Sequence, residues 1–215
     1  MKEYEIIFDQ ARKAMGFVPN TLPAMSKKPN IMGSFVLLMT NIRGFASSDT
    51  SPLTGIRLIV KNVMWMIRAK RESAEEVPVY LKDLIGHVAS NAAGCRYCQA
   101  HTAHTAHRNG VALEKLQNVW EFQTSDLFSA KEKAALEFAF AAGSVPNQVT
   151  RKHHEALKQY FSDEQIVEIM GIIAIFGFLN RWNDSMATQL EDEPLQFAEQ
   201  YLSATWEAGK HQNVA

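Results

Sequence analysis

Residues 83–107 read DLIGHVASNAAGCRYCQAHTAHTAH, and they contain both cysteines of the chain and four of its seven histidines. Cys95 and Cys98 form a Cys-x-x-Cys pair, whose sulfurs lie one helical turn apart and can close a disulfide without a large backbone movement. At the start of a helix, the backbone N–H groups and the helix dipole favour the thiolate, which is the nucleophilic form. The stretch therefore predicts a reactive dithiol at a helix N-terminus.

The residues around the pair predict two helices joined at a glycine. Apolar residues recur at helical spacing through residues 79–93, and Gly94 separates them from a second helix that starts at the cysteines. On that second helix, Cys98 and His101 are three residues apart and share a face. If the chain turns back at Gly94, the Asp83 carboxylate approaches His101. The carboxylate would then orient the imidazole, and the imidazole would take the thiol proton.

Three further side chains of this stretch are candidates for the relay or for a substrate pocket. His87 lies one turn after Asp83, so it either belongs to the relay or is a local partner of that carboxylate. His104 shares a stripe with His101 and competes with it as the base. Tyr97 stands between the cysteines and either lines the pocket or packs in the core.

The order of an acid, eleven residues, Cys-x-x-Cys and a following histidine resembles the alkylhydroperoxidase D and carboxymuconolactone decarboxylase superfamily. The chain is most similar to the peroxidase-related branch, which keeps both cysteines. The resemblance is strongest over residues 83–109 and extends more weakly to residues 16–20 and 180–186. It implies an all-helical, oligomeric fold and a relay of a glutamate, two cysteines and a histidine. Here Asp83 stands at the glutamate position, and Thr102 stands where the histidine usually falls.

The same resemblance implies a thiol-dependent alkyl hydroperoxidase, an antioxidant enzyme without a bound cofactor. Its substrate would be a hydroperoxide, and its electrons would come from an external protein or small-molecule thiol or dithiol reductant. The resemblance also implies that Cys98 attacks the hydroperoxide and that Cys95 resolves the product. The pair by itself leaves this order open, because the first cysteine of a Cys-x-x-Cys is often the more acidic one. Decarboxylases of the superfamily typically lack the pair, which favours redox chemistry.

The same residues also fit other functions. A carboxymuconolactone decarboxylase-like lyase would use His101 and Asp83 as base and acid, and a non-enzymatic redox sensor or scaffold would use the thiols without turnover. The two cysteines could also simply pack in the core. A zinc site is disfavoured, because there is no second cysteine pair and because His101, His104 and His107 lack the spacing of common structural sites. We expect no metal.

The composition bounds the class of protein. The chain has 215 residues, of which 47% are hydrophobic, enough for a sizeable core. The formal net charge of −1 gives no reason to expect nucleic acid or a membrane as a partner. The charged N-terminal sequence lacks a signal core, and the apolar run at 166–179 contains Glu168 and suits a buried helix. We therefore expect a cytoplasmic protein, where a Cys-x-x-Cys is more often catalytic or metal-binding than structural.

The pattern along the whole chain predicts an all-α bundle of the alkylhydroperoxidase D-like type. Helical periodicity recurs between Gly, Pro and polar links, and no pair of alternating strands with a hairpin turn is present. We expect one domain over residues 1–215, with a helical extension at 1–48, a core at 50–190 and a C-terminal helix and tail at 191–215. The helices at 31–42, 55–67 and 166–179 are too apolar for one small bundle to bury, so we expect a homo-oligomer.

A weak internal repeat relates two parts of the chain. Aligning Asp83 with Glu168 pairs Cys98 with Asn183 and preserves the order of an acid, a small-residue helix and a polar–Arg–aromatic–polar segment. The repeat predicts that Trp182, Asn183 and Asp184 lie near the cysteine pair. A helix cap is the alternative for this segment.

Overall fold

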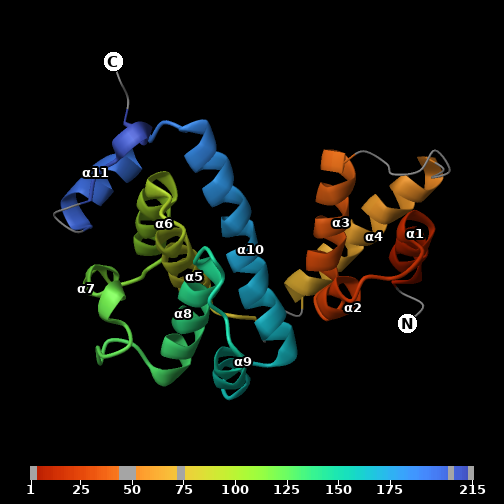
Figure 1. The fold of residues 1–215 in the computed structure, drawn as a ribbon, viewed down its shortest axis with the longest axis horizontal. Coiled ribbons are helices and arrows are strands. Elements are labelled where there is room, and N and C mark those ends of the chain that lie inside the picture. Colours follow the sequence, from red (N-terminus) through yellow and green to blue (C-terminus); the bar gives the residue numbers. More distant parts are fainter. Residues whose placement is uncertain (1–3, 44–51, 72–75, 203–205, 213–215) are drawn as a thin grey trace. The chain divides into compact units, whose positions relative to one another are not determined.

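The computed structural model describes residues 4–43, 52–71, 76–202 and 206–212, and within these ranges the chain forms helices and no strand (Figure 1). The prediction of an all-α fold is confirmed. The elements are α1 (Glu5–Met15), α2 (Thr21–Met25), α3 (Pro29–Arg43), α4 (Pro52–Arg71), α5 (Val79–Ala92), α6 (Arg96–Arg108), α7 (Leu113–Gln117), the 3₁₀ helix η2 (Val119–Glu121), α8 (Ala130–Gly143), α9 (Arg151–Lys158), α10 (Asp163–Met186), α11 (Asp192–Tyr201) and the 3₁₀ helix η3 (Gly209–His211).

Contacts divide the chain into two compact units, residues 1–76 with 163–168 and residues 77–162 with 169–215. In the first unit, α3 and α4 pack along each other, and Met32, Leu58 and Trp65 are buried there with residues of α1 and α2. We expected α4 to belong to the core at 50–190, but it groups with the N-terminal helices instead. Periodicity predicts which face of a helix is apolar, and it does not predict which partner that face meets.

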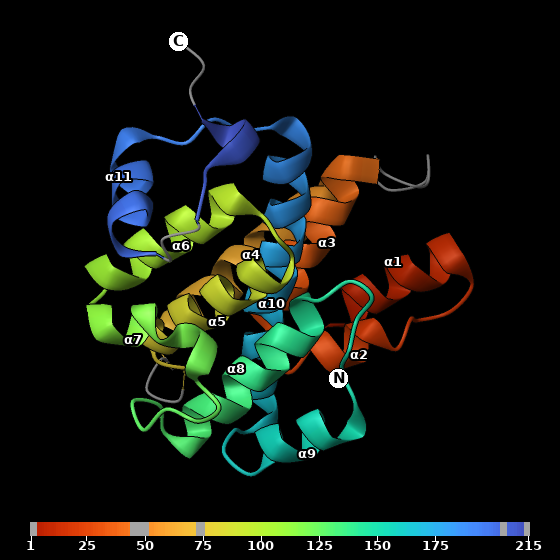
Figure 2. The same cartoon turned by 60° about the vertical axis from the view of Figure 1, so that its left-hand side comes forward.

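The second unit contains the cysteine stretch. Helix α5 packs between α6 and α8, and α11 also packs against α6 (Figure 2). The approach of α5 to α8 is close, because a Cβ atom at Gly143 would lie only 2.7 Å from the carbonyl oxygen of Ala89. The predicted pair of helices is confirmed, and the chain reverses between them at Gly94, whose φ of +76° is a conformation that favours glycine.

Helix α10 is longer and more exposed than the sequence predicted. It continues past the expected end at residue 179 to Met186. Among the described residues it is the one helix long and apolar enough to cross a membrane by length and composition, which is weak evidence, since core helices of soluble proteins pass the same test. Only 22% of its apolar window is buried within the single chain. The expectation of a buried helix is therefore wrong for one copy of the chain.

Candidate active site

Cys95 and Cys98 lie at the N-terminal end of α6 as two free thiols, with their sulfurs 2.7 Å apart. Cys95 is the N-cap residue of the helix, and its Sγ accepts a hydrogen bond from the backbone N–H of Cys98 at 3.2 Å. Both residues are buried, with exposed fractions of 0% and 3%. The pair thus occupies the helix N-terminus at which a thiolate is stabilised.

The two thiols differ in acidity. The hydrogen bond with the Cys98 thiol holds the pKa of Cys95 below its ordinary value. Burial acts in the opposite direction, and the backbone N–H of Cys98 lowers the pKa further. The same thiol–thiol hydrogen bond, with burial, raises the pKa of Cys98. Cys95, whose sulfur also accepts the backbone N–H of Cys98, is therefore the member that ionises first. This difference in pKa argues against Cys98 as the attacking thiol, which is the role that the family resemblance implies.

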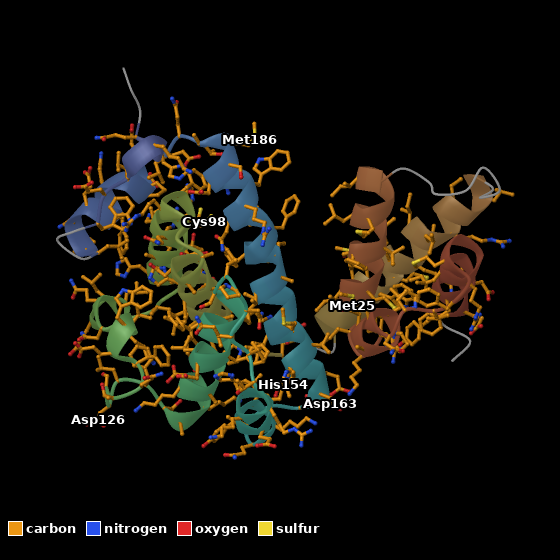
Figure 3. The ribbon with its side chains drawn as sticks, viewed as in Figure 1. Met25, Cys98, Asp126, His154, Asp163 and Met186 are labelled. Atoms are coloured by element: carbon orange, nitrogen blue, oxygen red, sulfur yellow. The ribbon has the colours of Figure 1, made fainter. Side chains whose placement is uncertain are left out.

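The C-terminal turns of α10 lie against the cysteine pair. The side-chain amide of Asn183 donates a hydrogen bond to Cys98 Sγ at 3.8 Å. Figure 3 shows Cys98 on α6 beside the C-terminal end of α10, and this helix ends at Met186. The internal repeat paired Cys98 with Asn183, and the predicted proximity of this segment to the cysteines is confirmed.

His101 is held by a carboxylate, but that carboxylate is Glu191 rather than Asp83. The Nε2 atom of His101 lies 2.6 Å from Glu191 Oε2, and the hydroxyl of Tyr97 donates to the other carboxylate oxygen at 3.2 Å. The rings of Tyr97 and His101 stack with centroids 4.4 Å apart. Glu191 was not predicted, because it lies 90 residues beyond its partner and no local spacing connects the two.

The ionisation states of Glu191 and Tyr97 follow from their contacts. Burial opposes ionisation of Glu191, but hydrogen bonds from its own backbone N–H and from His101 hold its pKa below the ordinary value. Burial and the neighbouring Glu191 carboxylate raise the pKa of Tyr97 to about 12. At neutral pH, an ionised Glu191 therefore accepts hydrogen bonds from an un-ionised phenol and from the imidazole.

Asp83 and His101 line the same small pocket without a hydrogen bond between them. Asp83 Oδ2 accepts a hydrogen bond from the side-chain amide of Asn109 at 2.8 Å. Gly86 allows the ring of Phe176 to close one wall, since a Cβ atom at this glycine would lie 2.3 Å from that ring. The cavity has a volume of about 100 Å³ and is lined by Asp83, His101, Thr102, Thr105 and Phe176.

His87 belongs to a buried hydrogen-bond chain that includes Thr102. The Thr102 hydroxyl donates to the Cys98 carbonyl oxygen at 2.6 Å, so its oxygen accepts the Nδ1–H of His87 at 2.9 Å. The Nε2 atom of His87 then accepts from the amide of Asn91 at 3.2 Å. Burial lowers the pKa of His87 to about 4, which keeps the ring neutral. Neither ring nitrogen contacts Asp83, so His87 is not the local partner of that acid.

His104, the expected competitor of His101, packs against an aromatic ring. Its ring centroid lies 5.5 Å from that of Phe197 on α11, and His107 lies against the same ring at 5.3 Å. Within the ranges that the structure describes, no three His, Cys, Asp or Glu side chains converge as ligands for a metal ion. The residues brought to the cysteines are therefore Asn183 and Asp184 of α10, with the cluster of Tyr97, His101 and Glu191 nearby.

The carboxymuconolactone decarboxylase family matches residues 62–141. The debrominase Bmp8 in its apo form is 33% identical, over 93% of this chain and 91% of that chain, with a TM-score of 0.57. A cysteine-to-alanine variant of Bmp8 in complex with 2,3,4-tribromopyrrole is similar at 31% identity, with the same coverage and TM-score.

Two further proteins are more distantly similar to this chain. A protein of unknown function from Agrobacterium tumefaciens that carries the name of the antioxidant defence protein AhpD is 22% identical over 62% of this chain and 90% of its own, with a TM-score of 0.52. The uncharacterised protein YnjA of Escherichia coli is 28% identical over 129 residues, which are 60% of this chain and 69% of that protein.

Proposed function

Because this chain belongs to the alkylhydroperoxidase D and carboxymuconolactone decarboxylase superfamily, we propose that it is a thiol-dependent peroxidase that reduces hydroperoxides with Cys95 and Cys98. The supporting observation is the pair of free thiols 2.7 Å apart at a helix N-terminus, one of them acidified by the other. An external thiol or dithiol reductant, a protein or a small molecule, restores the pair after each turnover. A reducing compartment such as the cytoplasm suits this cycle.

The proposed reaction has two steps that balance in atoms and electrons. The Cys95 thiolate attacks the terminal oxygen of the hydroperoxide, so that an S–O bond forms, the O–O bond breaks and the alkoxide takes a proton and leaves as an alcohol. Cys98 then attacks the sulfenic acid, and water leaves as the disulfide forms. The two sulfurs supply two electrons. The short separation of the sulfurs supports a direct second step.

Proton transfer in these steps is assigned to the side chains around the pair. His101 is the base and acid, and Glu191 orients its ring through the hydrogen bond at 2.6 Å. Asp83, on the wall of the same pocket, is the second carboxylate available to the relay. Tyr97 stacks on His101 and fixes the position of that ring. His87 supports the turn that holds Cys98, through Thr102, whereas the packing of His104 against Phe197 favours a structural role.

Replacing Glu191 by glutamine is expected to lower kcat/KM for hydroperoxide about tenfold, because the imidazole loses the carboxylate that orients it. The loss should be smaller than the effect of removing either cysteine, since the imidazole itself remains. The measurement is the pH profile of hydroperoxide consumption, and Glu193→Gln in the first turn of α11 is the matched control. Equal rates of hydroperoxide consumption in the two variants at every pH would contradict a role for Glu191 in the relay.

A second substrate class is favoured by one specific observation, the 33% identity to the debrominase Bmp8 over 93% of this chain. We propose a brominated heteroaromatic compound as the alternative substrate of the same thiols. In that reaction the carbon–bromine bond breaks, the carbon takes a proton, bromide leaves and the Cys95–Cys98 disulfide forms. Both substrates thus accept two electrons from one dithiol, and they differ in the leaving group.

A thiol count on the reduced protein tests the function directly. One equivalent of cumene hydroperoxide is added to one sample and one equivalent of 2,3,4-tribromopyrrole to another, and thiols, alcohol and bromide are measured. Loss of both thiols with alcohol formation, reversed by dithiothreitol, supports the peroxidase. Thiol loss and bromide release with tribromopyrrole, together with intact thiols in the cumene hydroperoxide sample, would support the debrominase in place of the peroxidase.

Two intact thiols in both samples would overturn both proposals. Turnover of a cyclic acid by a Cys95→Ser, Cys98→Ser double variant would then support the lyase. Stoichiometric oxidation without turnover, accompanied by a change in assembly, would support the sensor.

We also propose that the chain functions as a homo-oligomer. Helix α4 exposes Ile56, Ile59 and Val63 at helical spacing, and α10 exposes a similar stripe that includes Phe178 and Trp182. Exposed apolar stripes of this kind mark association surfaces. Light scattering at micromolar concentration should therefore give a mass that is a multiple of 24.2 kDa. A mass of one chain under these conditions would contradict the proposal.

A further inference from the structure

The segment at residues 206–212 packs against the cysteine end of α6. The indole N–H of Trp206 donates to Gln99 Oε1 at 3.0 Å, one residue beyond Cys98. Trp206 and Ala208 are buried in one cluster with Ala100. In both ribbon views the short helix η3 lies next to the first turn of α6 (Figures 1 and 2). The segment therefore brings its polar side chains close to the thiols.

Three of these polar groups form a charge cluster, which consists of Asp184, Lys210 and His211. Lys210 Nζ lies 2.9 Å from one Asp184 oxygen, and His211 Nε2 lies 3.5 Å from the other. His211 Nδ1–H donates to the carbonyl oxygen of Thr188 at 2.8 Å, and Nε2 of the same ring faces the Asp184 carboxylate. That nitrogen is buried without a hydrogen-bond partner, and the His211 side chain is 1% exposed.

The charge cluster adjoins both cysteines. Asn183, which precedes Asp184, donates its hydrogen bond to Cys98 Sγ. Beyond the dominant hydrogen bond with Cys98, the Asp184 charge raises the pKa of Cys95 and the Lys210 charge lowers it. The Lys210 ammonium also holds the pKa of Asp184 below its ordinary value, so the carboxylate stays ionised next to the thiolate. One anion and one cation thus act on the same sulfur in opposite directions.

We propose that Asp184 and Lys210 are positioning residues that set the reactivity of Cys95. This inference rests on the proposed function, in which Cys95 is the attacking thiol. Lys210 offsets the Asp184 charge. Without the ammonium, the carboxylate would repel the thiolate. Without the carboxylate, the ammonium would attract the thiolate.

Other groups around the pair define what the experiment must hold constant. Asn183 contacts Cys98 Sγ, and His211 faces the Asp184 carboxylate. The titratable and charged groups that face the pair are Cys98 and Tyr97 on α6, Asp184 on α10, Lys210 and His211 on η3, and Glu191 through its hydrogen bond to Tyr97. Of these described groups, the Asp184–Lys210 pair can be changed without altering a group that touches a sulfur or the relay.

The two cysteines can be followed separately, because trypsin cleaves after Lys82, Arg96 and Arg108 and places them in different peptides. The alkylation rate of Cys95 by iodoacetamide is measured against pH by peptide mass spectrometry. The midpoint is the pH at which the alkylation rate of Cys95 reaches half its maximum. In Lys210→Met, this midpoint should rise by about half a pH unit, so that alkylation of Cys95 below the midpoint becomes about threefold slower. Asp184→Asn should shift the midpoint down by a similar amount. The double variant should return close to the wild-type profile.

Lys152→Met on α9 is the matched control and should leave the profile unchanged. Lys210→Arg keeps the charge and should also match the wild type, which separates charge from packing. Unchanged midpoints in Lys210→Met and Asp184→Asn, or shifts of both in the same direction, would overturn the inference. The measurement uses no hydroperoxide. A protein that shows these shifts but does not consume hydroperoxide would therefore contradict the proposed function alone.

Discussion

Cys95→Ser is expected to lose more than about a thousandfold in hydroperoxide consumption, because the thiolate that attacks the peroxide oxygen is gone. Cys98→Ser should instead react once and stop, since the sulfenic acid on Cys95 lacks the thiol that condenses with it. Serine is the suitable replacement at position 98, because its hydroxyl can still form a hydrogen bond with the Cys95 sulfur, which lies 2.7 Å from the Cys98 sulfur. The measurement is stopped-flow peroxide loss, with the sulfenic acid trapped by dimedone.

The opposite distribution of the sulfenic acid between the two variants would reverse the roles of the cysteines. A sulfenic acid that accumulates in Cys95→Ser and not in Cys98→Ser would show that Cys98 attacks, as the family resemblance implies. The difference in acidity between the thiols argues against this, because a raised pKa leaves Cys98 protonated when Cys95 is ionised. Ser90→Ala on α5 is a control that keeps both thiols, and it should retain the wild-type burst.

The local part of the site was predictable from the sequence. The Cys-x-x-Cys spacing, the glycine after the first helix and the helical spacing of Cys98 and His101 all concern residues within a few turns of one another. The proximity of Asn183 was also predicted, although it lies 85 residues away, because the internal repeat paired it with Cys98. Local pattern and internal symmetry therefore led to the first contacts of the thiols.

The partners of the relay were not predictable in the same way. Asp83 shares a pocket with His101 as expected, but the hydrogen bond to that ring comes from Glu191. Lys210 and Glu191 are separated from the cysteine stretch by whole helices, and exposed charged residues carry no periodic signal. Their roles depend on where α11 and η3 return to α6, which is decided by the burial of apolar residues such as Trp206 and Leu190.

The ion pair of Lys115 and Glu132 is expected to contribute strongly to the stability of the fold. Glu132 is 5% exposed, and its Oε1 lies 2.5 Å from Lys115 Nζ. Its other oxygen accepts from the backbone N–H of Ser129 at 2.8 Å, and the Ser129 hydroxyl in turn accepts from the Glu132 N–H. This capping box begins α8, the helix that packs on α5.

Glu132→Ala is expected to lower the free energy of unfolding at neutral pH by about 3 kcal/mol, because the half-buried Lys115 ammonium loses its counter-charge and α8 loses a cap. Chemical denaturation measures this loss. Glu155→Ala, an exposed glutamate of α9, is the matched control and should change the free energy by less than about 0.5 kcal/mol. Similar losses in the two variants would mean that the ion pair contributes nothing beyond an ordinary surface charge.

The pH dependence of the Glu132→Ala effect provides an independent check. Burial opposes ionisation of Glu132, but Lys115 and Ser129 hold its folded-state pKa below the ordinary value of 4.5. A carboxyl group with a depressed folded-state pKa binds fewer protons in the folded state than in the unfolded state, so its stabilisation is fully present above pH 4.5 and decreases as the pH falls through the folded-state pKa. The difference between the wild type and Glu132→Ala should therefore be constant near neutrality and shrink in acid. A difference that stays constant into acid would indicate that packing, and not the charge, carries the effect.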